Sequence, residues 1–159
     1  MANRTGYTGL QIGIHWIMAL LIAGAFFTHE NMGAALRQKI EAGIVGPGTP
    51  TPHTILGMLA LLFVIWRIVV RLRNGAPEPH GSHAVVAAAK WGHRLLYLLM
   101  VAVPVGGFVA WFFGLRDVGE IHELAGKALV ILALGHAAAA VWHHVAQKDG
   151  TLRRMTRPE

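Results

Sequence analysis

Four long apolar segments alternate with polar stretches rich in glycine and proline. They cover about residues 10–28, 54–71, 93–113 and 122–145. Each approaches the roughly 20 residues that a helix needs to cross the hydrocarbon core of a bilayer. The first is too long for a cleaved signal peptide, and no small-residue cleavage site follows it. The pattern predicts four transmembrane helices, with loops at 29–51, 74–82 and 114–119.

Composition agrees with one membrane domain. Of the 159 residues, 54% are hydrophobic and 14% are charged, which excludes disorder and disfavours a water-soluble globule. Four spans would take about half of this length, so we expect a single domain over residues 1–159. The expected fold is all-α, an antiparallel up-down bundle of four transmembrane helices. The absence of cysteine excludes disulfides, iron–sulfur clusters and covalent haem attachment.

Basic residues are distributed unevenly between the two sides of the predicted bundle. Ten of the 14 Lys and Arg residues precede the first span, lie at the junction of the second and third spans, or follow the fourth. The other four are Arg37, Lys39, Arg116 and Lys127. Because cytoplasmic segments retain positive charge, both termini are expected in the cytoplasm. This bias accounts for the net charge of +6, so no nucleic-acid partner is expected.

Four of the 10 histidines are the main ligand candidates by their positions along the predicted spans. His15 lies in the first span, His53 begins the second, and His122 and His136 belong to the fourth. Ionisable residues inside a bilayer are costly and usually functional. The interval from His122 to His136 rotates an α-helix by about 1400°, some 40° short of four turns, and advances it by about 21 Å. Both imidazoles should therefore leave one helix face at two depths.

The directions of the spans pair these four histidines. His53 and His122 should lie near the outer side, and His15 and His136 near the cytoplasmic side. Two neutral imidazoles on opposite faces of a haem saturate its iron and favour electron transfer over oxygen binding. The pattern therefore predicts two b haems across the membrane. A small residue four positions after each histidine leaves room for a flat macrocycle, although such residues also permit tight helix packing. These residues are Ala19, Gly57, Gly126 and Ala140.

Other polar residues are further candidates for contact with a cofactor. His143 follows His136 by seven residues, but it lies at the helix end, where a solvated role is favoured. His93 is expected to begin the third span at the cytoplasmic surface, where it either packs or contacts a haem propionate or quinone. Arg67 and Arg71 are expected near the propionates of the inner haem, with snorkelling to lipid phosphates as an equal alternative. No residue is assigned a catalytic role.

An ordered set of motifs extends over nearly the whole chain. It contains Gly13-Ile14-His15-Trp16, His53 with Gly57, Arg67-Ile68-Val69-Val70-Arg71, Gly92-His93 with Tyr97, Pro104-Val105-Gly106-Gly107, His122-Glu123, Gly135-His136 and His143-His144. Together these motifs resemble the bacterial cytochrome b561 family. The resemblance implies a multi-pass dihaem cytochrome of the bacterial inner membrane, with axial ligands at His15, His53, His122 and His136. It also implies reaction with ubiquinone. The segment 29–51 does not carry the family pattern.

The resemblance leaves two functions open. The chain is either a quinone-linked oxidoreductase with a small anionic outer donor such as superoxide, or a relay between quinone and a partner dehydrogenase or periplasmic protein. For the first function, the four outer basic residues form a candidate cluster for attracting an anion, with solvated loop charges as the alternative. A non-haem metal transporter is disfavoured because the chain has no Glu-x-x-His pair for a di-iron site.

Overall fold

The computed structural model describes residues 6–79 and 81–158, and within these ranges it contains helices and no strands. The elements are α1 (Gly9–Phe27), α2 (Met32–Glu41), α3 (Pro52–Asn74), α4 (His83–Phe113) and α5 (Arg116–Trp142), followed by a π-helical turn (His143–Gln147) and a 3-10 turn (Arg153–Met155). The helices α1, α3, α4 and α5 are each long and apolar enough to cross a membrane. The predicted all-α fold with four spans is confirmed.

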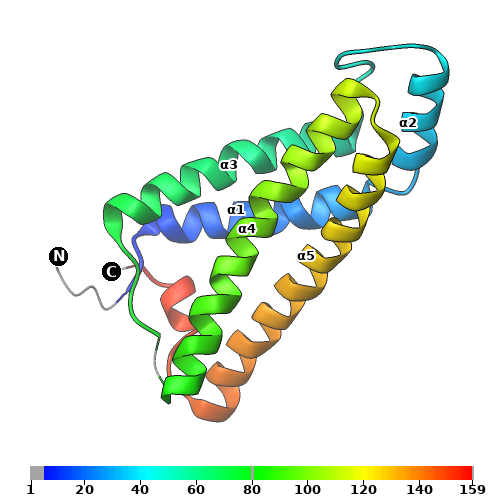
Figure 1. Cartoon of the computed structure of the whole chain (residues 1–159). Coiled ribbons are helices and arrows are strands. Elements are labelled where there is room, and N and C mark those ends of the chain that lie inside the picture. Colours follow the sequence, from blue (N-terminus) through cyan, green and yellow to red (C-terminus); the bar gives the residue numbers. More distant parts are fainter. Residues whose placement is uncertain (1–5, 80, 159) are drawn as a thin grey trace.

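The four long helices form two antiparallel pairs. Helix α1 packs mainly on α3, α4 packs mainly on α5, and α3 also contacts α4. The pairs converge near α2 and diverge toward the opposite end, where the C-terminal segment lies between them (Figure 1). A small core is centred on Ile14 and Val64. Large apolar side chains elsewhere face outward, with Leu20, Phe27 and Leu72 more than 70% exposed, as a lipid-facing surface requires.

Local signals explain where the helices begin and end. Thr8 and Gln11 form a capping box before α1, and Thr51 and Thr54 form another before α3. In each box the two side chains bind backbone N–H groups that have no partner inside the helix. Helix α4 ends at Phe113 and is capped by Gly114, whose φ of 68° lies in the left-handed region that favours glycine. These polar and glycine signals set the turns between apolar runs.

Two helix starts and one loop predicted from hydropathy were wrong. The expected loop at 29–51 contains α2, α4 begins at His83 instead of residue 93, and α5 begins at Arg116 instead of residue 122. Hydropathy detects the most apolar run, whereas a helix continues beyond it as long as each added residue gains a backbone hydrogen bond. For α4, the Ser82 side chain accepts the N–H of Val85 and caps this extended start.

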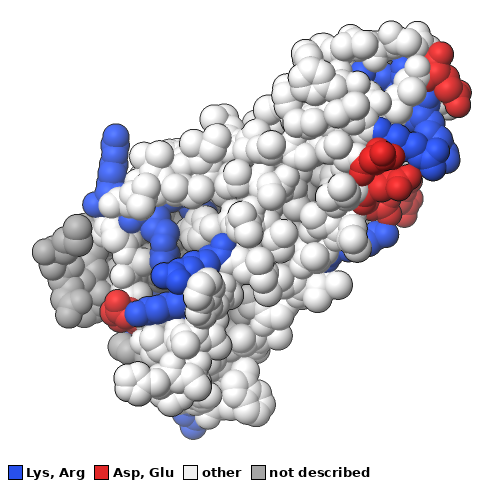
Figure 2. Space-filling model, viewed as in Figure 1, with Lys and Arg blue, Asp and Glu red and all other residues white. Residues whose placement is uncertain are grey.

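Charge differs between the two ends of the molecule. Figure 2 shows acidic and basic side chains mixed at the end that carries α2, and mainly basic side chains at the other end. The basic residues near that other end include Arg71 and Arg73 of α3 and Lys90 and Arg94 of α4. Gly9 lies beside Pro158, so the described parts of both termini share the basic end. The cytoplasmic assignment of this end stays a prediction, and Arg4 lies outside the described residues.

Candidate functional site

His53 and His122 face each other near the end of the bundle that carries α2. Their ring centres are 5.9 Å apart, with the ring planes 79° to one another. The Nδ1 of His53 donates to the Ala25 carbonyl at 2.8 Å, and the Nδ1 of His122 donates to the Val103 carbonyl at 2.8 Å. A carbonyl oxygen only accepts, so each neutral ring keeps its proton on Nδ1 and presents the lone pair of Nε2. The Nε2 atoms of His53 and His122 are therefore both free to bind a metal at this site.

A cavity of about 530 Å³ surrounds this outer pair, within the roughly 300–1,000 Å³ of typical cofactor pockets. Its lining is mainly apolar and includes Gly57, Gly107 and Gly126. A Cβ at Gly107 would lie 2.8 Å from Cε1 of His122, so only glycine lets that ring stand there. A Cβ at Gly57 would meet no protein atom within 4 Å. Glycines therefore leave space beside the imidazoles.

The outer pair and its cavity fit a haem. Two metal–imidazole bonds of about 2 Å each, with the ring radii added, place the ring centres about 6 Å apart. The observed 5.9 Å agrees with one metal between the rings. Within residues 6–79 and 81–158, no cluster of three or more His, Asp or Glu side chains is arranged to hold a bare ion. A two-histidine set instead suits iron whose other ligands come from a porphyrin.

His15 of α1 and His136 of α5 form a second pair toward the basic end. Their ring centres are 6.3 Å apart, which is again about the distance expected with a metal between them. His93 of α4 also meets His136, with ring centres 5.0 Å apart. That separation corresponds to a direct ring contact. The structure thus brings together the pairs that the span directions predicted, and it adds a third imidazole to the inner pair.

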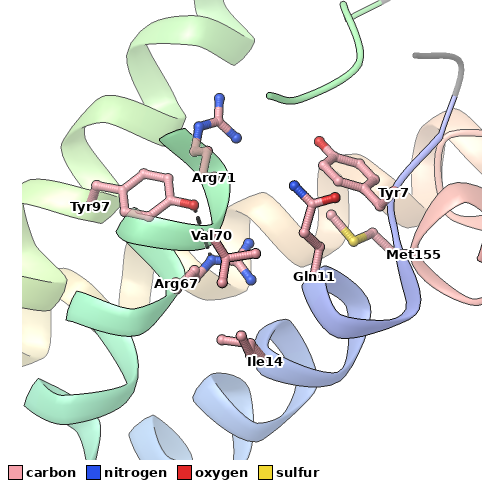
Figure 3. Close-up of a pocket in the computed structure, with 8 residues that line it drawn as sticks. All are labelled: Tyr7, Gln11, Ile14, Arg67, Val70, Arg71, Tyr97 and Met155. Atoms are coloured by element: carbon pink, nitrogen blue, oxygen red, sulfur yellow. Dashed lines mark hydrogen bonds between the residues drawn. The ribbon is translucent and has the colours of Figure 1, made fainter. Parts of the chain in front are cut away.

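Polar side chains surround the inner pair on its basic side. The Nη2 of Arg67 donates to Nδ1 of His15 at 3.1 Å, and its Nε donates to the hydroxyl of Tyr97 at 3.1 Å. The guanidinium carbon of Arg71 lies 5.5 Å from the centre of the Tyr97 ring. Figure 3 shows Arg67, Arg71 and Tyr97 on one side of a small pocket, facing Gln11 and Tyr7. Arg67 therefore contacts the inner pair through His15, and Arg71 lies beside Tyr97.

Two other histidines differ in their surroundings. The expectation that His93 begins a span at the surface was wrong, because α4 starts ten residues earlier and carries His93 to the inner pair. His143 donates through Nδ1 to Asp149 at 2.6 Å, whereas His136 faces His15. Burial opposes the charge of Asp149, but hydrogen bonds from Thr151 and His143 outweigh it and lower the pKa of the carboxyl to about 2. His143 is thus engaged with the C-terminal segment.

The four outer basic residues have different environments. Lys39 is only 6% exposed, and its Nζ donates to the Ile44 carbonyl at 2.7 Å and lies over the Trp111 ring. Arg116 pairs with Glu120 at 3.0 Å. Lys127 pairs with Glu123 at 2.7 Å. Arg37 lines the outer cavity, and none of the ion pairs found among the described residues involves it. Three of the four predicted cations therefore have other partners.

The sequence did not reveal several contacts that shape the two sites. The carbonyls of Ala25 and Val103 orient the outer ligands, yet backbone groups carry no residue-specific signal. The Tyr97 hydroxyl anchors Arg67, and the tyrosine was noted only as part of a motif. His29 was expected in a loop, and the structure places it in the lining of the outer cavity. Each contact depends on helices distant in sequence.

Four apolar spans with facing histidine pairs define a membrane cytochrome of the b type. The family model described as prokaryotic cytochrome b561 matches residues 6–158, and the chain belongs to this family. It is 38% identical over 162 residues to cytochrome b562 of Cereibacter sphaeroides, covering 99% of each chain. It is also 31% identical over 172 residues to the probable superoxide oxidase CybB of Yersinia pestis, covering 94% of each chain. A third relative is cytochrome b561 homolog 2 of Escherichia coli, 26% identical over 94% of this chain and 90% of that protein.

The resemblance predicted from the motifs is therefore confirmed. Membership of the family makes the chain a multi-pass membrane protein of electron transport, and it implies haem b as the cofactor. This conclusion agrees with the outer histidine pair, whose spacing and cavity suit a haem.

Proposed function

We propose that this chain carries electrons across a bacterial inner membrane through two b haems, one held by His53 and His122 and the other by His15 and His136. The observation that carries the proposal is the outer pair, with ring centres 5.9 Å apart beside a cavity of about 530 Å³. The 6.3 Å separation of the inner rings supports a second haem. Each haem, when bound, supplies reversible one-electron chemistry at its iron.

The residues of the chain hold and tune these two sites. Each pair of imidazoles would hold its haem iron through two ring nitrogens, which favours electron transfer over oxygen binding. His122 and His136 lie on the same helix, about 21 Å apart along its axis, which separates the sites across the thickness of the membrane. Arg67 and Arg71 offer positive charge near the inner pair, where propionates would find charge-assisted partners. The outer cavity is lined mainly by apolar residues, which suit the apolar faces of a macrocycle.

Haem stoichiometry and site-specific loss test this arrangement. Pyridine haemochrome analysis of the purified protein should give two haems per chain, and a redox titration should resolve two midpoints. His122→Ala should remove the outer haem, and His136→Ala should remove the inner one. His143→Ala, in the π-helical turn that follows α5, is the matched control, because its ring binds Asp149, and it should retain both haems. One haem per fully loaded chain, or loss of a haem in the control alone, would contradict the proposal.

For the electron donor and acceptor, we propose superoxide and ubiquinone. In a balanced reaction, two superoxide anions lose one electron each to form oxygen, and ubiquinone gains two electrons and two protons to form ubiquinol. The 31% identity to a relative named as a probable superoxide oxidase supports this donor. Arg37 lines the outer cavity and provides one cation near the site.

A second candidate is a relay that receives electrons from a partner protein. The pairing of Arg116 and Lys127 with glutamates favours it, because paired charges attract a small anion weakly. The two functions differ in the activity of the isolated chain. Purified protein supplied with enzymatically generated superoxide and a short-chain ubiquinone should form ubiquinol if superoxide is the donor. Haem reduction that occurs only after a membrane or periplasmic fraction is added would favour the relay.

A further inference from the structure

The outer histidines are held ready to bind a metal. His53 and His122 each donate an Nδ1 hydrogen to a backbone carbonyl at 2.8 Å. A neutral imidazole carries one proton, so the Nε2 of each ring has a free lone pair. The two carbonyls come from α1 and α4, and these neighbouring helices therefore fix the ligating tautomer of rings on α3 and α5.

His15 of the inner pair has the opposite arrangement. Its Nδ1 lies 3.1 Å from Nη2 of Arg67. A guanidinium has only donor hydrogens and keeps its charge, so Nδ1 of His15 must act as the acceptor. The proton of the neutral ring is then on Nε2. Neither nitrogen of His15 offers a free lone pair, because Arg67 uses the one on Nδ1 and a proton occupies Nε2.

Arg67 is held in this position by a second contact. Its Nε donates to the Tyr97 hydroxyl at 3.1 Å, so α4 anchors the guanidinium that α3 presents to α1. His15 is mostly buried in the bundle, and its Nδ1 has no other recorded hydrogen-bond partner among the described residues. The contact is therefore a defined hydrogen bond between helices. Releasing it costs more than reorienting a surface side chain, because a hydrogen bond from a charged group is among the stronger ones.

We infer that Arg67 delays loading of the inner haem by holding His15 in its non-ligating tautomer, so that the outer site fills first. This inference rests on the proposed function, since it assumes that both histidine pairs bind haem. For His15 to ligate through Nε2, Arg67 must leave Nδ1, and the ring must lose a proton from Nε2 and gain one at Nδ1. The ring gains or loses no net proton. Arg67 is thus a positioning residue that sets the order of assembly.

Loading kinetics of single-site variants test the inference. The full-length chain is produced under haem limitation, purified in detergent and mixed with haemin, and the low-spin Soret band is followed over time. His15→Ala leaves only the outer pair, and His122→Ala leaves only the inner pair. The outer site should load faster by about 10- to 100-fold, the range spanned by breaking one charge-assisted hydrogen bond. Adding Arg67→Met to the inner-only variant should remove most of that difference.

The control variant is Arg73→Met, which removes the same charge from an exposed position on the same helix. In the inner-only background it should leave the slow loading rate unchanged. Equal loading of the two sites, or an inner rate that Arg67→Met does not raise, would overturn the inference and leave the proposed function intact. Absence of a low-spin spectrum from the wild-type chain would refute the proposed function, and the inference with it.

A direct measurement of the histidine tautomers tests the inference on the wild-type chain, so the result does not require that a substituted chain fold correctly. Long-range proton–nitrogen NMR of the histidine-labelled, haem-limited wild-type chain distinguishes the two neutral forms by their ring nitrogen shifts. His15 should show a protonated Nε2, whereas His53 and His122 should show a protonated Nδ1. Assignment uses single His→Gln variants. The same tautomer at His15 as at the outer histidines would overturn the inference, whatever the loading rates.

Discussion

Substituting Gly107 by alanine should expel the outer haem while leaving the bundle folded. A Cβ at this position would lie 2.8 Å from Cε1 and 3.0 Å from Nδ1 of the His122 ring. Real Cβ atoms essentially never approach so closely, so the ring must move. Its movement would also break the 2.8 Å hydrogen bond from Nδ1 to the Val103 carbonyl, and the ring would lose the contact that fixes its ligating tautomer.

The expected magnitude follows from these two effects. Overpacking by one methyl group in a close-packed site costs about 1–3 kcal/mol, and loss of one hydrogen bond costs about 1 kcal/mol. If both costs raise the free energy of the haem-bound state alone, the affinity for the outer haem falls by about 30- to 1,000-fold. The inner pair lies deeper toward the basic end, so its haem should remain. The protein should then contain one haem per chain, with one remaining midpoint in a redox titration.

Two matched glycine variants complete the assay. Gly13→Ala adds a methyl group that meets no atom within 4 Å on an exposed helix position, so it should retain both haems and should not lower the melting temperature. Gly57→Ala also meets no protein atom, but it projects from the lining of the outer cavity. It should weaken the outer haem without lowering the stability of the haem-limited chain. A Gly107→Ala protein with two haems and unchanged midpoints would refute the reasoning.

Three further predictions concern the ends of the bundle. The pKa of Asp149 is lowered to about 2 from its ordinary value of 3.8, so its contribution to stability should be complete above about pH 4 and be lost as the pH falls toward 2. Thermal melts followed by circular dichroism should show this loss in wild type and a flatter profile in Asp149→Asn; parallel profiles would contradict it. Lys39→Met should destabilise the packing of α2 by about 1–2 kcal/mol, because it removes a buried hydrogen bond and a cation over Trp111. Faster hydrogen exchange in residues 32–50 would show this effect, and unchanged exchange would count against it. If superoxide is the donor, Arg37→Gln should slow haem reduction several-fold and flatten its dependence on salt, whereas Lys127→Gln should have a smaller effect because Glu123 already pairs with Lys127. Equal rates and salt slopes in both variants and wild type would favour the relay function.

The sequence by itself determined the four spans, the family and the candidate ligands. The length of an apolar segment indicates a membrane helix directly, because crossing the bilayer requires a minimum number of residues. The interval between His122 and His136 also places both rings on one face of any α-helix. These properties depend on local geometry and composition, which the order of residues contains.

Only the tertiary structure decided how those candidates are oriented. The Nδ1 partners of the outer rings are carbonyls on other helices, while Nδ1 of His15 meets Arg67. Each partner is set by how two helices pack, and a carbonyl has the same chemistry in every residue. The presence of α2 was likewise missed. So was the burial of Lys39, because the aliphatic part of a lysine side chain can lie under a neighbouring loop while its ammonium group donates to a carbonyl. Residue types thus identify which groups can bind a haem, and helix packing decides which nitrogen each imidazole presents.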